Sequence, residues 1–190
     1  MGAFAALLAA SRDRMMFDRM FLCAPMVSIG GLPLGVGAMA TLLEGACFVG
    51  LGQVPVGRKD DRSPTDKTFP GNTLTSDFAR YMRVVDTYAN CPDLEISSPS
   101  IRWMAASFRA MARAGADDFP AKINTPILML AAARDGVVST PAIEQLGLRL
   151  RSGRHAVIAH ARHEMFMEND DIRGQVFAAF DAFITEQTPN

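Results

Sequence analysis

Residues 126–138 read PILMLAAARDGVV, an apolar run that ends in a polar turn. The unbroken apolar stretch Pro126–Ala132 predicts a short strand that is buried on both faces of a sheet. Asp135 follows the carboxyl end of this strand, the edge of an α/β sheet at which ligands bind. An aspartate in such a place can also serve only to cap the next turn, and position alone leaves both roles open.

Two further short apolar runs have the same character, Met20–Ala24 and His155–Ala159. Helices are expected around them, where apolar residues recur at helical spacing. The expected helices are Gly2–Ser11, Thr140–Leu150 and a segment that begins after Asp170 and Asp171. Because strands and helices alternate at both ends of the chain, the sequence predicts the α/β class with a parallel sheet.

Residues 28–120 differ from both ends, because they contain no convincing strand. One helix is expected at Ala38–Val49, and a second after a cap at Thr75 or Ser76. A third is expected to begin at a cap at Ser98 or Ser100 and to end at Gly115. Residues 58–71 are expected to form a charged loop. We interpret this mainly helical block as an inserted lid. The predicted organisation is an α/β core at residues 1–27, a lid at 28–120 and the rest of the core at 121–190. The Met and Phe side chains of the lid are most simply core, or they line an apolar pocket for an acyl chain.

Composition excludes several classes of protein. The chain has 190 residues, 49% of them hydrophobic, and a formal net charge of −1, so it can bury a core and has no basic surface typical of nucleic-acid binding. Its three cysteines form no CxxC pair, which argues against a disulfide framework or a zinc site and favours a cytoplasmic setting. The 24 residues from Met20 to Leu43 are uncharged, but prolines and glycines within them argue against a transmembrane helix.

A histidine follows the third predicted strand, because His163 lies 28 residues beyond Asp135. If the two residues end neighbouring strands, the carboxylate can hold one imidazole nitrogen and leave the other free as a general base. This pairing favours a catalytic role for His163, because a loop histidine without such a partner usually has no catalytic role. An HExxH zinc motif is excluded by Met167, and His160, His163 and Glu164 form only a weak candidate metal site. The two G-x-G pairs lack a third glycine and a preceding strand, which argues against nucleotide binding. No metal or organic cofactor is expected.

A nucleophile for such an Asp–His pair is missing from the chain. In α/β hydrolases the order is Ser, Asp, His, and the serine lies in a G-x-S-x-G turn between a strand and a helix. The chain opens with Met1-Gly2-Ala3 leading directly into a helix, as would follow the serine of a G-x-S-M-G elbow. None of the serines or cysteines within the chain lies at a strand-to-helix elbow of this form.

Several segments together resemble the C-terminal part of the lysophospholipase and monoacylglycerol lipase group of serine α/β hydrolases, especially bacterial lysophospholipase L2-like proteins. They occur in the family's order along nearly the whole chain: Met1-Gly2-Ala3, Leu22–Met26, Asn72–Asp77, Thr125–Leu128, Arg134–Val138 and Ala161–Glu164. The resemblance implies a partial α/β-hydrolase fold, with Asp135 as the triad acid, His163 as the triad base and the backbone N–H of Met1 as one oxyanion-hole donor. It implies no cofactor. The chain departs from the family in lacking its first strands, its other oxyanion donor and the serine itself.

The expected function is hydrolysis of a carboxylic ester in a lysophospholipid or a monoacylglycerol, by a longer protein of which residues 1–190 alone are inactive. The lid is expected to cover the carboxyl ends of the strands and to make transient contact with a membrane surface. Two rival functions remain: a non-catalytic remnant or binding module, and another activity on the same frame, such as an acyltransferase or a peptidase. An in-frame G-x-S upstream of Met1 would separate the first rival from ester hydrolysis, and substrate profiling would separate the second.

Overall fold

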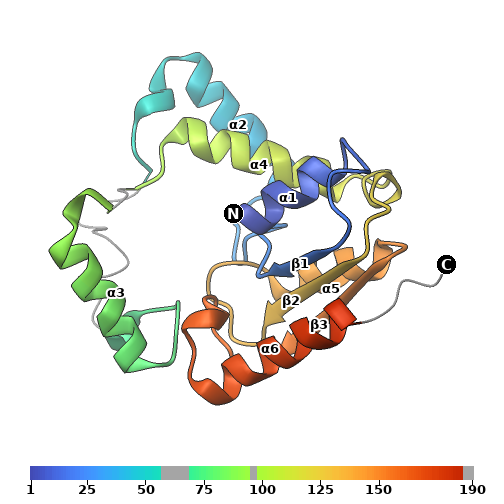
Figure 1. Ribbon diagram of the computed structural model, residues 1–190. Coiled ribbons are helices and arrows are strands. Elements are labelled where there is room, and N and C mark those ends of the chain that lie inside the picture. Colours follow the sequence, from blue (N-terminus) through green and yellow to red (C-terminus); the bar gives the residue numbers. More distant parts are fainter. Residues whose placement is uncertain (57–68, 95–97, 186–190) are drawn as a thin grey trace. The chain divides into compact units, whose positions relative to one another are not determined.

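The computed structural model describes residues 1–56, 69–94 and 98–185, and it divides the chain into two compact units (Figure 1). The core unit comprises Met1–Gly30, Thr73–Asp77 and the residues from Ala116 onward, and the helical unit comprises the described residues of Gly31–Asn72 and Phe78–Gly115. At both junctions the core unit reaches a few residues farther than the expected bounds of 1–27 and 121–190. It also takes in Thr73–Asp77 (the 73–77 segment), which lies in the middle of the expected lid.

A parallel sheet forms the centre of the core unit. Its three strands are β1 (Met20–Cys23), β2 (Ile127–Ala132) and β3 (Gly153–Ile158), in the order β1-β2-β3. The predicted α/β class is therefore confirmed. The middle strand β2 is buried, as its unbroken apolar sequence predicts. In contrast, β3 is less buried than predicted, with Val157 41% exposed, because within the described sheet it has a neighbour on one side only.

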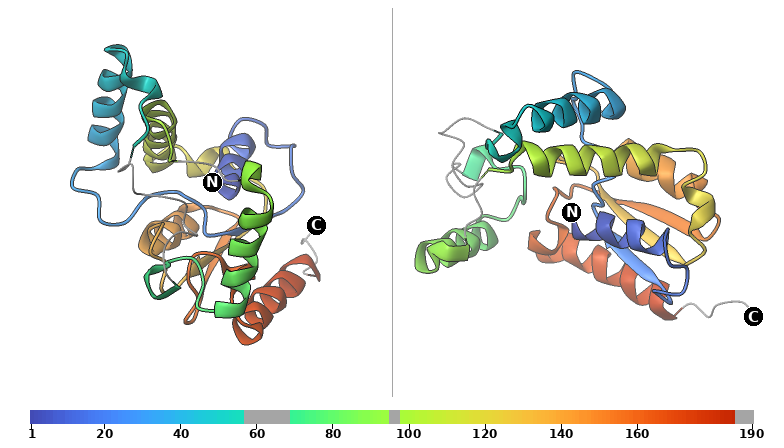
Figure 2. Two further views of the ribbon diagram at one scale, coloured as in Figure 1. Left: turned by 90° about the vertical axis from the view of Figure 1, so that its left-hand side faces the viewer. Right: turned by 90° about the horizontal axis from the view of Figure 1, so that it is seen from above.

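Helices cover both faces of this sheet. They are α1 (Gly2–Ala10), α5 (Thr140–Arg149) and α6 (Asp170–Thr185), with single 3₁₀ turns at Pro120–Lys122 and Met165–Met167. In β3, His155 lies against α5, whereas the adjacent Arg154 lies beside Phe183 of α6. Successive side chains of a strand point to opposite faces, so α5 and α6 lie on opposite sides of the sheet (Figure 2).

Side-chain caps explain where two of these helices begin. The hydroxyl of Ser139 accepts a hydrogen bond from the amide of Ala142, and Pro141 occupies the first turn of α5. At the start of α6, Oδ1 of Asn169 accepts a hydrogen bond of 3.0 Å from the amide of Ile172. Both helices therefore begin immediately after a loop that follows the carboxyl end of a strand.

Gly147 allows α5 to lie close to β3. A Cβ atom at Gly147 would lie 2.7 Å from Nδ1 and 3.0 Å from Cβ of His155. Gly147→Ala is therefore expected to lower the free energy of unfolding by about 1–3 kcal/mol, measured by urea denaturation. Gly174→Ala in α6 is the matched control, because that glycine has open space around it. The control is expected to raise stability by about 0.5–1 kcal/mol, and an equal loss in both variants would contradict the close approach at Gly147.

The helical unit contains α2 (Val36–Phe48), α3 (Phe78–Asn90) and α4 (Ile101–Gly115), with single 3₁₀ turns at Leu51–Gln53, Phe69–Gly71 and Pro92–Leu94. Helices α2 and α4 pack together, and an ion pair of 3.2 Å joins Glu44 to Arg109. Ser100 caps α4 as expected, because its hydroxyl accepts a hydrogen bond from the amide of Trp103. Helix α3 begins two residues beyond Ser76, the later of its expected caps.

Two further expectations concern the charged loop and the uncharged stretch from Met20 to Leu43. The charged loop expected at residues 58–71 lies mostly outside the described residues, which resume at Phe69. Within residues 1–56, 69–94 and 98–185, no helix has both the length and the apolar character needed to cross a bilayer.

Candidate active site

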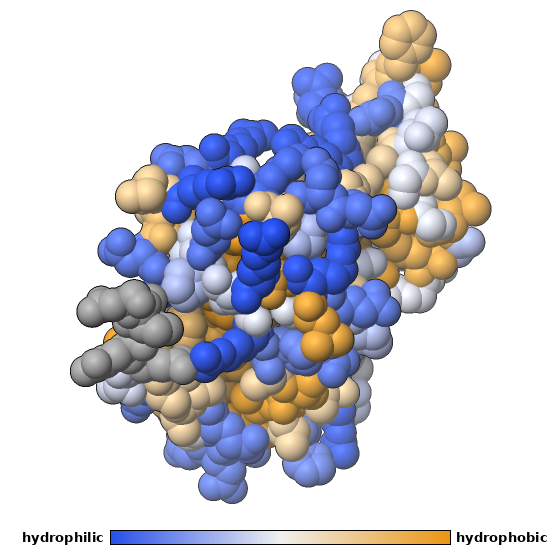
Figure 3. Space-filling view, turned by 90° about the vertical axis from the view of Figure 1, so that its right-hand side faces the viewer, coloured by the Kyte–Doolittle hydropathy of each residue, from blue (hydrophilic) through white to orange (hydrophobic). Residues whose placement is uncertain are grey.

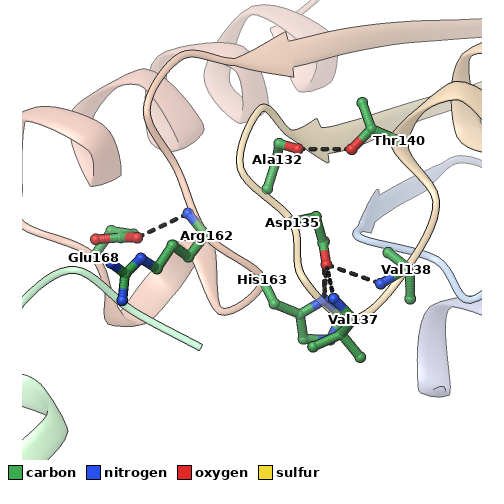
Figure 4. A network of polar contacts seen from close by, with 8 residues as sticks. All are labelled: Ala132, Asp135, Val137, Val138, Thr140, Arg162, His163 and Glu168. Carbon is green, nitrogen blue, oxygen red and sulfur yellow. Dashed lines mark hydrogen bonds and ion pairs between the residues drawn. The ribbon is translucent and has the colours of Figure 1, made fainter. Parts of the chain in front are cut away.

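The loop after β2 holds Asp135 by its own backbone. One carboxylate oxygen, Oδ1, accepts hydrogen bonds from the amides of Val137 at 2.8 Å and Val138 at 2.9 Å (Figure 4). The hydroxyl of Thr140 closes the loop by donating to the carbonyl of Ala132 at 2.7 Å. Asp135 therefore does cap the turn that follows its strand, and the other oxygen, Oδ2, remains for a second partner.

That partner is His163, from the loop after β3. Its Nδ1 lies 2.9 Å from Oδ2 and 3.2 Å from Oδ1 of Asp135. A carboxylate only accepts hydrogen bonds, so the contact assigns the proton to Nδ1 and leaves the lone pair on Nε2. The Asp135 side chain is fully buried and the His163 side chain is 17% exposed. The site can therefore offer one basic nitrogen to a molecule that arrives from outside.

The environment of Asp135 favours its ionised form. Burial alone would raise the pKa of this carboxyl group. The hydrogen bonds from His163, Val138 and Val137, together with the charge that His163 can carry, outweigh burial and hold the pKa below its ordinary value. The carboxylate is therefore ready to stabilise a protonated imidazole.

Backbone contacts hold the two loops against each other and against the 73–77 segment. The amide of Arg134 donates to the carbonyl of Ala161 at 2.9 Å, and the amide of Glu164 donates to the carbonyl of Leu74 at 2.8 Å. The amide of Arg162 donates to the buried carboxylate of Glu168 at 2.8 Å. No sequence pattern pointed to Glu168. The signal in the sequence that could have led to it is the Asn72–Asp77 motif, because the hydroxyl groups of Thr75 and Ser76 lie against that carboxylate.

Met1, the third expected site residue, immediately precedes α1. Its carbonyl accepts hydrogen bonds from the amides of Phe4 and Ala5. In Figure 1 this end of α1 lies on the side of the sheet toward which the strands point. No hydrogen bond or ion pair joins Met1 to His163 within the described part of the chain.

Within the described parts of the chain, no serine or cysteine hydrogen-bonds to His163, and no cluster of three His, Cys, Asp or Glu side chains could hold a metal ion. Cys23, at the end of β1, is poorly suited to act as a nucleophile. Burial, with a smaller effect from the charge of Glu164, raises the pKa of its thiol to about 12. A thiol with so high a pKa supplies almost no thiolate at neutral pH.

Comparison with known sequences identifies relatives among lipid hydrolases. Residues 1–170 match the Hydrolase_4 family, which is described as serine aminopeptidase, S33. A probable lysophospholipase L2 of Haemophilus influenzae is 29% identical over 97 residues, which cover 51% of this chain and 30% of that protein. The lysophospholipase L2 of Escherichia coli K12 is 30% identical over 132 residues, which cover 64% of this chain and 38% of that protein.

Comparison with solved structures agrees on the fold. A soluble variant of the monoglyceride lipase of Saccharomyces cerevisiae, solved with a substrate analog, superposes with a TM-score of 0.71 at 12% identity, covering 96% of this chain and 61% of that one. The present chain thus spans less than two thirds of each protein to which it is compared. The resemblance to the lysophospholipase and monoacylglycerol lipase group is confirmed, and the chain belongs to the Hydrolase_4 (serine aminopeptidase, S33) family of α/β hydrolases.

Proposed function

We propose that the protein containing this chain is a serine-type carboxylic ester hydrolase that acts on lysophospholipids or monoacylglycerols. In this proposal Asp135 is the triad acid and His163 is the triad base, and the serine precedes Met1. The observation that carries the proposal is the hydrogen bond between Nδ1 of His163 and Oδ2 of Asp135, which leaves Nε2 as the free base.

The proposed mechanism follows from this arrangement. Nε2 of His163 removes the proton from the serine hydroxyl as its oxygen attacks the ester carbonyl, and then gives that proton to the departing alcohol. A water molecule activated by the same nitrogen hydrolyses the acyl-enzyme. Throughout, the carboxylate of Asp135 stabilises the imidazolium that forms. Where Met1 follows a peptide bond, its N–H can donate to the oxyanion of the tetrahedral intermediate.

The names of the relatives support a lipid substrate. Two curated relatives are lysophospholipases, and a solved structure of the same fold is a monoglyceride lipase. The description of the matching family as serine aminopeptidase keeps a peptidase as the alternative function, since an Asp–His pair serves both reactions equally.

The experiment that tests this proposal compares residues 1–190 with a form extended upstream through an in-frame G-x-S. We expect the extended form to hydrolyse 1-monoacylglycerol or a lysophospholipid, and the shorter chain to release no fatty acid, because the nucleophile contributes a covalent step that Asp135 and His163 cannot supply. An aminoacyl p-nitroanilide serves as the peptidase substrate. Ester hydrolysis by the shorter chain would contradict the placement of the serine, and cleavage of the anilide alone would establish the peptidase.

We also propose that the helical unit contacts a lipid surface. Its described residues expose several large apolar side chains: Leu34, Leu42, Phe48, Val49, Leu51 and Val54. Phe48, at the end of α2, is 93% exposed, and Figure 3 shows apolar surface over this part of the molecule. Glu44 is the only charged residue of α2. Burial of such side chains in a bilayer interface would remove apolar surface from water.

The lipid contact is tested by co-sedimentation with phosphatidylcholine vesicles. Replacing Phe48 and Val49 with serine is expected to weaken vesicle binding by about tenfold or more, because each large apolar side chain contributes about 1.5–3 kcal/mol when buried. Met15→Ser is the matched control, since Met15 is equally exposed but lies in the core unit. Equal losses in both variants, or no loss in the double variant, would argue against contact through α2.

A further inference from the structure

Glu168 is a charged side chain with no solvent exposure, five residues after His163. Its Oε1 accepts a hydrogen bond of 2.8 Å from the amide of Arg162. Its Oε2 accepts one of 3.0 Å from the amide of Ser76 and a short one from the Ser76 hydroxyl. A buried carboxylate is strongly destabilising unless hydrogen bonds satisfy it, and here both oxygens are satisfied.

The partners of Glu168 come from two places far apart in the sequence. Arg162 is the residue before His163, whereas Ser76 belongs to the 73–77 segment, 92 positions from Glu168. The carboxylate therefore joins the histidine loop to a segment whose neighbours on either side belong to the helical unit. The two amides donate to different oxygens of Glu168, and a carboxylate accepts at both of its oxygens at once.

The same segment meets the residues around His163 through further hydrogen bonds. The amide of Glu164, the residue after His163, donates to the carbonyl of Leu74 at 2.8 Å. The guanidinium of Arg162 donates to the carbonyl of Thr75 at 3.1 Å, and the hydroxyl of Thr75 donates to the carbonyl of Met167 at 2.6 Å. Both chain neighbours of His163 are thus hydrogen-bonded to the 73–77 segment, directly or through Glu168. Figure 4 shows the bond between Arg162 and Glu168.

The 73–77 segment also lies against the loop of Asp135. A Cβ atom at Gly136 would lie 3.1 Å from both Cβ and Cγ2 of Thr73, so the backbone there approaches the threonine closely. One short segment therefore contacts the loop of the acid and the loop of the base. A movement of this segment would change the distance between Asp135 and His163.

We infer that Glu168 is a positioning residue for His163: its buried carboxylate fixes the histidine loop on the 73–77 segment and so keeps Nδ1 of His163 against Asp135. The catalytic consequence rests on the proposed function, in which this contact orients the base. The side chain itself acts through the backbone and does not touch the substrate. A displacement of about 1 Å in a catalytic group can lower the rate by about 10²-fold.

Two substitutions at Glu168 remove one or both of its hydrogen-bond acceptor oxygens. Both are made in the full-length protein that contains this chain. Glu168→Gln retains one carbonyl oxygen, so an NH₂ group must face one of the two amides. Glu168→Met retains none. We expect kcat to fall by about tenfold in the first variant and by about 10²-fold in the second, with KM changed by less than about twofold. Glu144→Gln in α5, where the side chain takes no part in this network, is the matched control and should leave kcat unchanged.

A spectroscopic readout separates positioning from mere stability. The proton on Nδ1 of His163 should give a downfield NMR resonance because it is hydrogen-bonded to a carboxylate. We expect this resonance to broaden or move upfield in Glu168→Met. A folded Glu168→Met variant with the wild-type resonance and the wild-type kcat would overturn the inference. If Glu168→Met does not fold, Glu168→Gln and Ser76→Ala test the inference instead. Each should lower kcat and should broaden the resonance or move it upfield, by less than is expected for Glu168→Met.

The two proposals can fail separately. If the wild-type protein hydrolyses no ester, the proposed function is wrong. The resonance still tests the role of Glu168 in that case, because the contact between His163 and Asp135 requires no substrate.

Discussion

Replacing His163 with alanine in the full-length protein is expected to lower kcat for ester hydrolysis by about 10⁴-fold or more. In the proposed mechanism, no other group then takes the proton from the serine hydroxyl or returns it to the departing alcohol. Because substrate binding does not depend on this proton transfer, KM should change little. Release of fatty acid from a monoacylglycerol under saturating conditions measures the effect.

His160→Asn is the matched control for this prediction. His160 lies in the same loop, is exposed, and has a positive φ of 63°, a backbone conformation that asparagine tolerates. The control should keep activity within about twofold of the wild type, because exposed side chains away from a site rarely matter. Retention of more than about a tenth of the wild-type activity in His163→Ala would exclude a triad that uses this residue.

Asp135→Asn is expected to lower kcat by about 10⁴-fold, although its shape is nearly unchanged. The amide oxygen can still accept from Val137 and Val138, at the position that Oδ1 has in the wild type. The NH₂ group then faces Nδ1 of His163 and favours the tautomer in which the proton is on Nε2. That nitrogen can no longer accept a proton from serine. Asp181→Asn, at an exposed position of α6, is the matched control and should leave kcat unchanged.

The difference in stability between the wild type and Asp135→Asn is expected to depend on pH. Because the folded protein holds the pKa of Asp135 below its ordinary value of 3.8, ionisation of this group stabilises the fold above that pH. The contribution is lost as pH falls through the lower pKa of the folded state. The difference in free energy of unfolding between wild type and Asp135→Asn should therefore shrink as the pH falls below about 4, as measured by urea denaturation. A difference that stays constant down to pH 2 would contradict the shift.

Local patterns in the sequence predicted the frame of the molecule. The central strand was recognisable because burial on both faces requires an unbroken apolar run, and the helices because their apolar residues recur at one spacing. Asp135 and His163 could be paired because parallel strands bring the loops at their carboxyl ends to one edge of the sheet. Each of these inferences uses residues that are close in sequence or a general rule of topology.

The network around Glu168 could not be predicted in this way. Its hydrogen bonds join residues 92 positions apart, and no periodicity encodes such a pairing. From the sequence, Thr75 and Ser76 are expected to cap a helix, because the same hydroxyl residues commonly begin helices. In the folded chain these hydroxyls contact Met167 and Glu168 of the core unit. A capping pattern and a tertiary anchor therefore look identical in the sequence.

The return of the 73–77 segment to the core unit makes the insertion two separate excursions, Gly31–Asn72 and Phe78–Gly115. Each excursion begins and ends on the core, so each closes its own shorter loop and can vary in length with a small change in closure entropy, about 0.6 kcal/mol for a doubling. A designer could exchange either excursion for that of a relative while leaving the other untouched, provided that Thr73–Asp77 and Glu168 are retained. Chimaeras made at these four junctions would exchange the helical unit in halves, with the loops of Asp135 and His163 held constant.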